Sequence, residues 1–300
     1  MLWYESFDKL RPQRLRVLCE EAMSRHTTFR VGGPARRMAF PETESELAAL
    51  LDLAVRAGYP YTVIGNGSNL LAPDQGLDRL VINTSRVDTV TVVGTAIHAL
   101  AGATLARIAN AAQRAGLTGL EFAHGIPGTL GGAVFMNAGA YGGEMRQVVQ
   151  SVRAWFPGEG IMTLTGAECG FGYRHSIFSE KPGVVLFVEL GLTAGDSAAI
   201  KAKMEELAAK RRASQPLELP SAGSTFKRPE GYYAGTLIDQ CGLKGARVGG
   251  AQVSEKHAGF IVNTGGATCA DVLGLIAKVQ ATVREKTGVE LEPEVRILRD

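Results

Sequence analysis

The feature that most constrains this chain is a glycine-rich stretch from His124 to Glu144, HGIPGTLGGAVFMNAGAYGGE. It contains seven glycines in twenty-one positions, a density that no helix or strand periodicity explains. Because glycine has no Cβ and tolerates positive φ, main-chain N–H groups here can come within bonding distance of a ligand. Such groups, curled into a concave nest, bind anions and above all phosphates. The alternative is a glycine-rich loop that only covers a core.

A second glycine-rich loop favours ligand binding. The apolar residues 61–64 predict a short strand, and GNGSN at 65–69 follows it directly. A strand that runs into a loop of glycine and polar residues is the usual setting of a phosphate site. Neither stretch matches a familiar nucleotide fingerprint, since GNGSN lacks the Walker lysine and neither supplies GxGxxG in a βαβ context. Together the loops suggest a large cofactor with a diphosphate, held mainly by backbone.

Length and composition indicate an ordinary globular protein. Its 300 residues allow two or three packed units, and 45% of them are apolar and 21% charged. A net charge of +2, without a basic run interleaved with aromatic residues, argues against nucleic-acid binding. We see no secretory signal in the charged N-terminal segment and no run of the roughly 20 apolar residues that a membrane span needs. We expect a cytoplasmic protein and a monomer, although no sequence feature fixes the oligomeric state.

The cysteines and histidines show no metal-binding pattern. Cys19, Cys169, Cys241 and Cys269 are scattered without a CxxC pair, which favours reduced thiols over disulfides. The five histidines share no HxxxH or similar spacing. We therefore expect no metal site.

Periodicity and capping residues predict mixed helices and strands. A helix begins after Thr43, with Glu46 completing a capping box, and a longer helix begins at the similar pair Thr268 and Asp271. Further helices are expected from 104, from 195 to about 212 and over 234–241, and residues 1–25 should be partly helical. Further strands are expected over 35–40, 79–84, 87–93, 97–101, 148–156, 161–164, 184–192, 259–263 and 293–298.

Seven sequence blocks, in order, resemble the MurB family of UDP-N-acetylenolpyruvoylglucosamine reductases, flavoenzymes of peptidoglycan synthesis. The blocks are TTFRVGGPA (27–35), VIGNGSNLL (63–71), GIPGTLGGAVFMNAGAYGGE (125–144), FGYRHSIF (171–178), SAGSTFKRP (221–229), LIDQCGLKG (237–245) and LEPEVRIL (291–298). The resemblance implies an α+β fold in which a two-part FAD-binding module of the vanillyl-alcohol-oxidase (PCMH) type precedes a third α+β substrate-binding domain. Residues 178–184 leave no room for an extra tyrosine-bearing loop, so the chain resembles the shorter, type II form.

The domain boundaries follow from this resemblance and from a proline-bounded connector at 214–220. We place FAD-binding subdomain 1 at 1–84, FAD-binding subdomain 2 at 85–213 and the substrate-binding domain at 214–292. The last strand, within 293–300, is expected to return to subdomain 1.

The resemblance implies that the enolpyruvyl group of UDP-N-acetylglucosamine enolpyruvate is reduced to give UDP-N-acetylmuramate. FAD, bound tightly but not covalently, would be reduced by NADPH and pass a hydride from N5 to the β carbon, and a proton would add to the α carbon. Negative charge would build up on the α carbon and its carboxylate, which calls for preorganised positive charge. A guanidinium suits this charge because its fork matches two oxygens.

Three residues match the catalytic groups of the family. Arg174 matches its arginine, Ser224 its proton donor and Glu294 its glutamate. Glu294 would either help to deliver the proton or stabilise the protonated enol form. Glu292 is the competing carboxylate, two residues away. Without the resemblance, Arg174 would be interpreted as part of a surface ion pair and Ser224 as the end of a tight glycine turn.

Binding residues are also implied. The expected cofactor-binding residues are Ile64, Gly65, Asn66, Gly67, Ser68, Asn69, Leu70, His124, Gly125, Ile126, Pro127, Gly128, Thr129, Gly131, Gly132, Ala133, Asn137, Gly139 and Ala140. The expected substrate-binding residues are Lys227, Arg228, Tyr232, Lys244 and His257, with Arg212, Arg247 and Tyr233 as further candidates. Arg228 and His257 stand where part of the family has asparagine and glutamine, which leaves those two contacts open. The charged residues of 201–212 read as a solvated helix face.

Two other functions fit the same cofactor module. The first is an FAD-dependent sugar or lactone oxidase that uses oxygen, in which His124 could be a covalent link to the flavin. The second is a non-enzymatic regulator that binds a nucleotide sugar, for which Arg174, Ser224 and Glu294 would be dispensable.

Overall fold

The computed structural model describes residues 2–299, which form two compact units. Unit 1 comprises residues 2–18, 37–66 and 79–211, and unit 2 comprises residues 19–36, 67–78 and 212–299. Unit 1 contains two hydrophobic clusters, and unit 2 contains a third. The finer division into three domains remains a prediction.

The N-terminal part of the chain forms a helix and a four-stranded sheet. Helix α1 spans Trp3–Leu10. The sheet has the order β1-β2-β5-β3, from strands Arg16–Ala22, Pro34–Phe40, Leu77–Asn83 and Tyr61–Ile64. The expected strand at 61–64 is confirmed with its bounds, and it runs parallel to β5. Helix α1 confirms that residues 1–25 are partly helical, whereas strand β1 was not predicted, because 16–22 mixes charged and apolar residues without a clear period.

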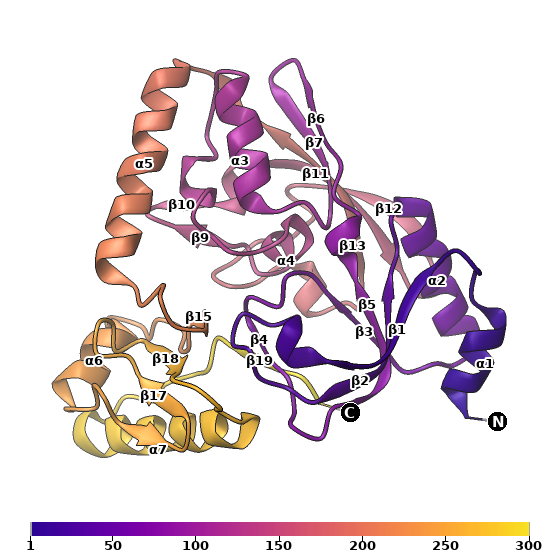
Figure 1. Cartoon of the computed structure of the whole chain (residues 1–300). Helices are drawn as coiled ribbons and strands as arrows, with labels where there is room; N and C mark the ends of the chain where they lie inside the picture. The colour runs from indigo at the N-terminus through magenta and orange to yellow at the C-terminus, as the bar shows by residue number, and fades with distance from the viewer. Residues whose placement is uncertain (1, 300) are drawn as a thin grey trace. The chain divides into compact units, whose positions relative to one another are not determined.

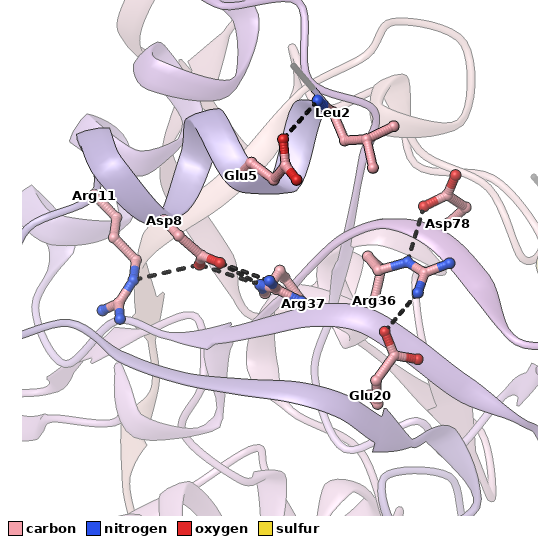
Figure 2. Close-up of polar contacts among 8 residues, drawn as sticks. All are labelled: Leu2, Glu5, Asp8, Arg11, Glu20, Arg36, Arg37 and Asp78. Atoms are coloured by element: carbon pink, nitrogen blue, oxygen red, sulfur yellow. Dashed lines mark hydrogen bonds and ion pairs between the residues drawn. The ribbon is translucent and has the colours of Figure 1, made fainter.

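Arginines on β2 pair with carboxylates on either side (Figure 2). In unit 2, Arg36 donates to Glu20 of β1 at 2.7 Å and to Asp78 of β5 at 3.3 Å. In unit 1, the next residue, Arg37, pairs with Asp8 of α1 at 2.6 Å. Successive side chains of a strand point to opposite faces, so these two arginines reach different partners.

Helix α2, Glu44–Arg56, follows β2 and begins with half of the expected capping box. The Thr43 hydroxyl accepts the Glu46 N–H at 3.1 Å, as expected. The Glu46 carboxylate, however, accepts the N–H of Glu42 at 2.9 Å, so the expected return bond to Thr43 is wrong. Leu47, Leu51 and Ala54 bury the inner face of the helix in one cluster of unit 1.

The rest of unit 1 is built on a five-stranded antiparallel sheet of order β12-β11-β13-β7-β6. Its strands are Gly160–Thr165, Val149–Phe156, Val184–Gly191, Ala96–Leu100 and Val90–Val93. Helix α3 spans Leu105–Arg114, helix α4 spans Leu130–Phe135 and helix α5 spans Ser197–Ser214. Two short pairs complete the unit, β8 (Leu117–Thr118) with β14 (Thr193–Ala194) and β9 (Gly139–Ala140) with β10 (Gly143–Glu144). The strand expected from 87 begins only at Val90, because residues 84–86 form a 3-10 turn.

Unit 2 contains a second antiparallel sheet, of order β15-β18-β17-β16. Its strands are Ser221–Ser224, Phe260–Asn263, Ala251–Val253 and Arg247–Val248, and helices α6 (Ala234–Gln240) and α7 (Cys269–Thr287) lie beside it (Figure 1). The capping box of α7 is confirmed, with Thr268 and Asp271 each accepting the other's N–H at 3.0 Å. The last strand, β19 (Arg296–Ile297), is shorter than expected and pairs in parallel with β4 (Leu70–Leu71).

Candidate active site

The two glycine-rich stretches meet inside unit 1. Strand β3 ends at Ile64, whose carbonyl accepts the Thr84 hydroxyl at 3.2 Å. The next residue, Gly65, lies so close to Thr129 that a Cβ at this position would overlap the Thr129 hydroxyl. Gly65 is therefore needed for packing between the loops, because any side chain would push them apart.

The second half of the 65–69 loop belongs to unit 2 and is fixed there by hydrogen bonds. Gly67 has φ +60, and a Cβ on it would overlap the carbonyl oxygen of His26. Its own carbonyl accepts the N–H of Thr28 at 3.2 Å. Farther along, the Asn69 side-chain amide donates to the backbone carbonyl of Glu294 at 3.0 Å. The predicted cofactor loop is thus tied directly to the segment of a predicted catalytic residue.

The 124–144 stretch is more regular than its glycine content suggested. Helix α4 forms within it, with Leu130, Ala133 and Val134 buried in the unit 1 core, so the expectation of no regular structure is wrong. Glycine disfavours a helix by about 1 kcal/mol per residue relative to alanine. Packing overrides that cost here, since Gly131 lets the helix approach Ala101 and donates its N–H to the Ala101 carbonyl at 2.8 Å.

His124, at the start of this stretch, has a buried ring nitrogen available to a ligand. Within residues 2–299, its Nδ1 has no hydrogen-bond partner although it is shielded from solvent. Burial lowers the pKa of His124, which favours the neutral imidazole. A buried polar atom without a partner is costly unless a ligand satisfies it, so His124 fits a place beside a bound cofactor.

Arg211 was not selected from the sequence, where it belonged to the solvated face of a charged helix. Its side chain lies over Gly125, with Cδ 3.1 Å from the position that a Cβ of this glycine would occupy. Burial lowers its pKa, partly opposed by Tyr141, and within residues 2–299 no carboxylate forms an ion pair with it. A half-buried guanidinium beside a glycine-rich loop suits a phosphate or carboxylate. Arg211 stands between two other basic residues, Lys210 and Arg212, so nothing in the sequence distinguishes it from them.

Arg174 lies in a tight turn of unit 1. Gly172 and His175 exchange backbone hydrogen bonds across the turn at 3.0 and 3.3 Å. Arg174 has φ +54, an uncommon conformation for a residue with a side chain, and its guanidinium lies 5.1 Å from the centre of the Tyr173 ring. Such backbone conformations persist where the surroundings enforce them and gather at functional sites.

Ser224 and Glu294 come from neighbouring segments of unit 2. The Thr225 carbonyl accepts the N–H of Glu294 at 2.8 Å, and the Glu292 carbonyl accepts the N–H of Lys227 at 2.8 Å. Ser224 ends strand β15 after an irregular pairing with β18, where Gly223 has φ +78. An irregularity of this kind re-aims the side chain that follows it.

The two candidate glutamates differ in their surroundings. Glu292 is largely exposed and its carboxylate pairs with Lys227 at 2.5 Å. Glu294 is only partly exposed. Because Glu292 is exposed and its carboxylate is taken up by Lys227, Glu294 is the better catalytic candidate.

The predicted substrate-binding residues form two groups in unit 2. In the first, Arg228 donates to the Tyr232 carbonyl at 3.3 Å and its guanidinium lies 4.0 Å from the centre of the Tyr233 ring. In the second, the charge of Lys244 helps to lower the pKa of His257, whose main cause is burial. Lys244 also pairs with Asp239 at 2.7 Å. Neither group includes Arg247, which contacts Gln252, or Arg212, whose carbonyl accepts a bond from Lys256.

Two other kinds of feature are absent from the part of the chain that the structure describes. Within residues 2–299, no group of three or more histidine, cysteine, aspartate or glutamate side chains could hold a metal ion. No helix in the same range is long and apolar enough to cross a membrane.

Known proteins resemble this chain over nearly its whole length. Residues 35–165 match a family described as FAD binding domain, and residues 215–298 match the C-terminal domain of UDP-N-acetylenolpyruvoylglucosamine reductase. The reductase of that name from Caldanaerobacter subterraneus subsp. tengcongensis is 51% identical over 283 residues, which cover 94% of each chain. The one from Latilactobacillus sakei subsp. sakei is 50% identical over 286 residues, covering 95% of this chain and 94% of the other.

A solved structure shows the same fold. The crystal structure of UDP-N-acetylenolpyruvylglucosamine reductase (MurB) from Thermus caldophilus superposes with a TM-score of 0.82 and 38% identity, covering 95% of this chain and 99% of the other. The fold class expected from the sequence, an FAD-binding module with a third α+β domain, is confirmed. FAD is accordingly the cofactor of this fold.

Proposed function

Since the chain belongs to the UDP-N-acetylenolpyruvoylglucosamine reductase family, and is an oxidoreductase, we propose that it reduces UDP-N-acetylglucosamine enolpyruvate to UDP-N-acetylmuramate with NADPH. The observation that carries this proposal is the backbone bond between Thr225 and Glu294, which joins the segments of the proton donor and the catalytic glutamate. When bound and reduced by NADPH, FAD would supply the hydride for the β carbon of the substrate.

The cofactor would be held without a covalent bond by the predicted residues of 64–70 and 124–140 other than Asn137, whose side-chain bonds lie within the protein. His124 supports this assignment because its buried Nδ1 lacks a partner within residues 2–299. Arg211 supports it because its guanidinium lies over Gly125, where it would meet a diphosphate. In the neutral imidazole that burial favours, Nδ1 of His124 either accepts or donates a hydrogen bond, according to the tautomer.

Arg174 would stabilise the charge that develops on the substrate. Its guanidinium can donate two parallel hydrogen bonds to the carboxylate conjugated with the reacting double bond. The left-handed backbone of Arg174 sets the direction in which its side chain leaves the turn. A preorganised donor contributes more than one that must reorganise during the reaction.

Ser224 would donate its Oγ proton to the α carbon. A hydroxyl is a weak acid, but the carbanion-like α carbon is a strong base, so the transfer runs downhill. Glu294 would help to deliver that proton or stabilise the protonated enol form. Glu292 is not expected to compete, because it pairs with Lys227 at the surface.

The nucleotide sugar would be bound by Lys227 and by the two groups of predicted substrate-binding residues in unit 2. Lys227, Arg228 and Lys244 would meet phosphate or carboxylate oxygens, and the half-exposed Tyr232 would stack on the uracil ring. His257, whose pKa is lowered by burial, would act as a neutral hydrogen-bonding group. We also propose that the protein works in the cytoplasm as a monomer and that its three predicted domains divide these tasks.

Product analysis tests the proposal. The purified protein should show flavin absorption and convert the enolpyruvyl substrate with NADPH to UDP-N-acetylmuramate, identified by mass spectrometry. Hydrogen peroxide formation from a sugar or lactone, without use of the enolpyruvyl compound, would instead indicate an oxidase. Substrate binding without turnover, unchanged by substitution of Arg174, Ser224 and Glu294, would indicate a regulator.

A further inference from the structure

We propose that Asn137 is a positioning residue that holds the Arg174 turn in its active conformation. This inference rests on the proposed function, because it assigns Asn137 a task in the reaction through Arg174. The sequence suggested Asn137 only as a cofactor contact, within the glycine-rich stretch.

The Asn137 side chain is buried and its hydrogen bonds lie within the protein. It is 1% exposed. Its Nδ2 donates to the Gly172 carbonyl at 2.9 Å and to the Glu144 carboxylate at 3.0 Å, and its Oδ1 accepts the N–H of Arg146 at 2.9 Å. Both amide protons are used, so no donor of this side chain remains for a cofactor.

The bond to Gly172 acts directly on the turn that carries Arg174. Gly172 is the first residue of that turn, and its N–H and carbonyl also exchange bonds with His175. Farther along, the Ser176 hydroxyl, fully buried, donates to the Phe135 carbonyl at 2.7 Å. The residues flanking Arg174 are therefore fastened on both sides to residues 135–137.

The backbone of Asn137 indicates that the contact is specific. Asn137 has φ +42, in the left-handed region that asparagine enters more readily than most residues. Arg174 is in the same region with φ +54. A part-buried hydrogen bond thus links Asn137 to the turn that holds Arg174, and uncommon backbone conformations of this kind persist where the surroundings enforce them.

Two substitutions separate the side chain of Asn137 from its backbone. Asn137→Gly keeps the left-handed backbone without strain but removes all three side-chain bonds. Asn137→Asp keeps the shape and the acceptor for Arg146 but loses both amide donors. The control is Asp52→Ala, which removes the acceptor of the Trp155 indole N–H at 2.7 Å in the same unit and touches neither the glycine-rich stretch nor the turn.

Hydrogen exchange of the purified holoprotein measures the turn directly. We expect the peptide covering 170–178 to exchange faster in Asn137→Gly and Asn137→Asp than in the parent and in Asp52→Ala. Steady-state kinetics should show kcat about 10- to 100-fold lower, the loss typical of a misplaced catalytic group, with flavin reduction by NADPH unchanged. In an Arg174→Ala background, Asn137→Gly should reduce turnover no further.

Unchanged hydrogen exchange over 170–178 in both Asn137 variants would overturn the proposal. So would a double variant, Asn137→Gly with Arg174→Ala, whose loss of turnover is the product of the two single losses. Loss of flavin with unchanged exchange would also overturn it, in favour of a direct cofactor contact. If Arg174→Ala itself turned over at the parental rate, the proposed role of Arg174 would fail. The exchange result would still decide whether Asn137 holds the turn.

Discussion

The segments that carry the proposed catalytic groups are held in two different ways. In unit 1, the Arg174 turn depends on side chains, the Asn137 amide and the Ser176 hydroxyl. In unit 2, the segments of Ser224 and Glu294 are joined by main-chain bonds between paired stretches. A main-chain bond survives substitution of either side chain, whereas a side-chain bond does not. The position of Arg174 should therefore be sensitive to substitution of Asn137 or Ser176, whereas the pairing of the Ser224 and Glu294 segments should tolerate substitution of their own side chains.

The largest expected effect tests unit 2 at its reacting group. Ser224→Ala should slow product formation by roughly 10² to 10⁴, the usual contribution of one general acid, or about 3 to 5 kcal/mol of barrier. Flavin reduction by NADPH, followed by absorbance, should stay at the parental rate because it precedes proton transfer to substrate. Ser221→Ala is the matched control on the same strand, since its carbonyl bond to Thr28 remains. Parental turnover in Ser224→Ala would remove Ser224 from the mechanism.

A smaller effect is expected at Arg174. Arg174→Ala should lower kcat by about 10² to 10³, as the loss of one preorganised charge-stabilising donor does. Arg174→Lys should recover only part of that loss, because lysine restores the charge without the planar fork. Rapid-mixing kinetics of substrate reduction measure both. Full recovery by lysine would mean that Arg174 acts only as a point charge.

A third effect concerns packing between the two glycine-rich stretches. Gly65→Ala should destabilise the protein by about 1 to 3 kcal/mol and reduce flavin retention, since the new methyl would overlap the Thr129 hydroxyl. The double variant Gly65→Ala/Thr129→Ala should regain part of the lost stability and part of the lost flavin, because it removes the clashing hydroxyl. Gly132→Ala is the contrasting variant, as its Cβ would lie 3.8 Å from the same hydroxyl. Thermal unfolding and bound-flavin absorbance measure the two losses, which should be larger in Gly65→Ala than in Gly132→Ala. Equal losses in the two variants would contradict the role given to Gly65 in packing.

The smallest effect is expected at Glu292. Glu292→Gln breaks an exposed pair with Lys227 and should change stability by less than about 1 kcal/mol and leave turnover near the parental value. Glu294→Gln should lower turnover while the fold stays intact, because its main-chain bond to Thr225 remains. Melting temperatures and kcat of the two variants give the comparison. The reverse order of activity losses would make Glu292 the catalytic glutamate.

Local sequence signals predicted the elements whose ends are marked by particular residues. Strand β3 was found with its bounds because an apolar run stops at Gly65, and α7 because Thr268 and Asp271 form a capping box. Helix α4 was missed because its glycines argue against a helix. Contact of Leu130 and Val134 with the core, which no local pattern reveals, makes it form.

Sequence blocks located the candidate catalytic residues but not what holds them. The bond between Asn137 and Gly172 spans 35 residues, and the paired segments of Ser224 and Glu294 lie farther apart still. Arg211 was missed because only the folded structure shows that its side chain is partly buried while those of Lys210 and Arg212 are exposed. The residues that hold the candidate catalytic groups can be identified only from the folded structure, which brings distant segments of the chain together.

The most direct test of the account follows the flavin itself. The holoprotein is reduced by NADPH without oxygen and then mixed rapidly with UDP-N-acetylglucosamine enolpyruvate, while flavin absorbance is recorded. We predict rapid reoxidation with one molecule of UDP-N-acetylmuramate formed for each flavin, and much slower reoxidation by oxygen alone. Reduced flavin that is reoxidised quickly by oxygen and left unchanged by the enolpyruvyl compound would contradict the account.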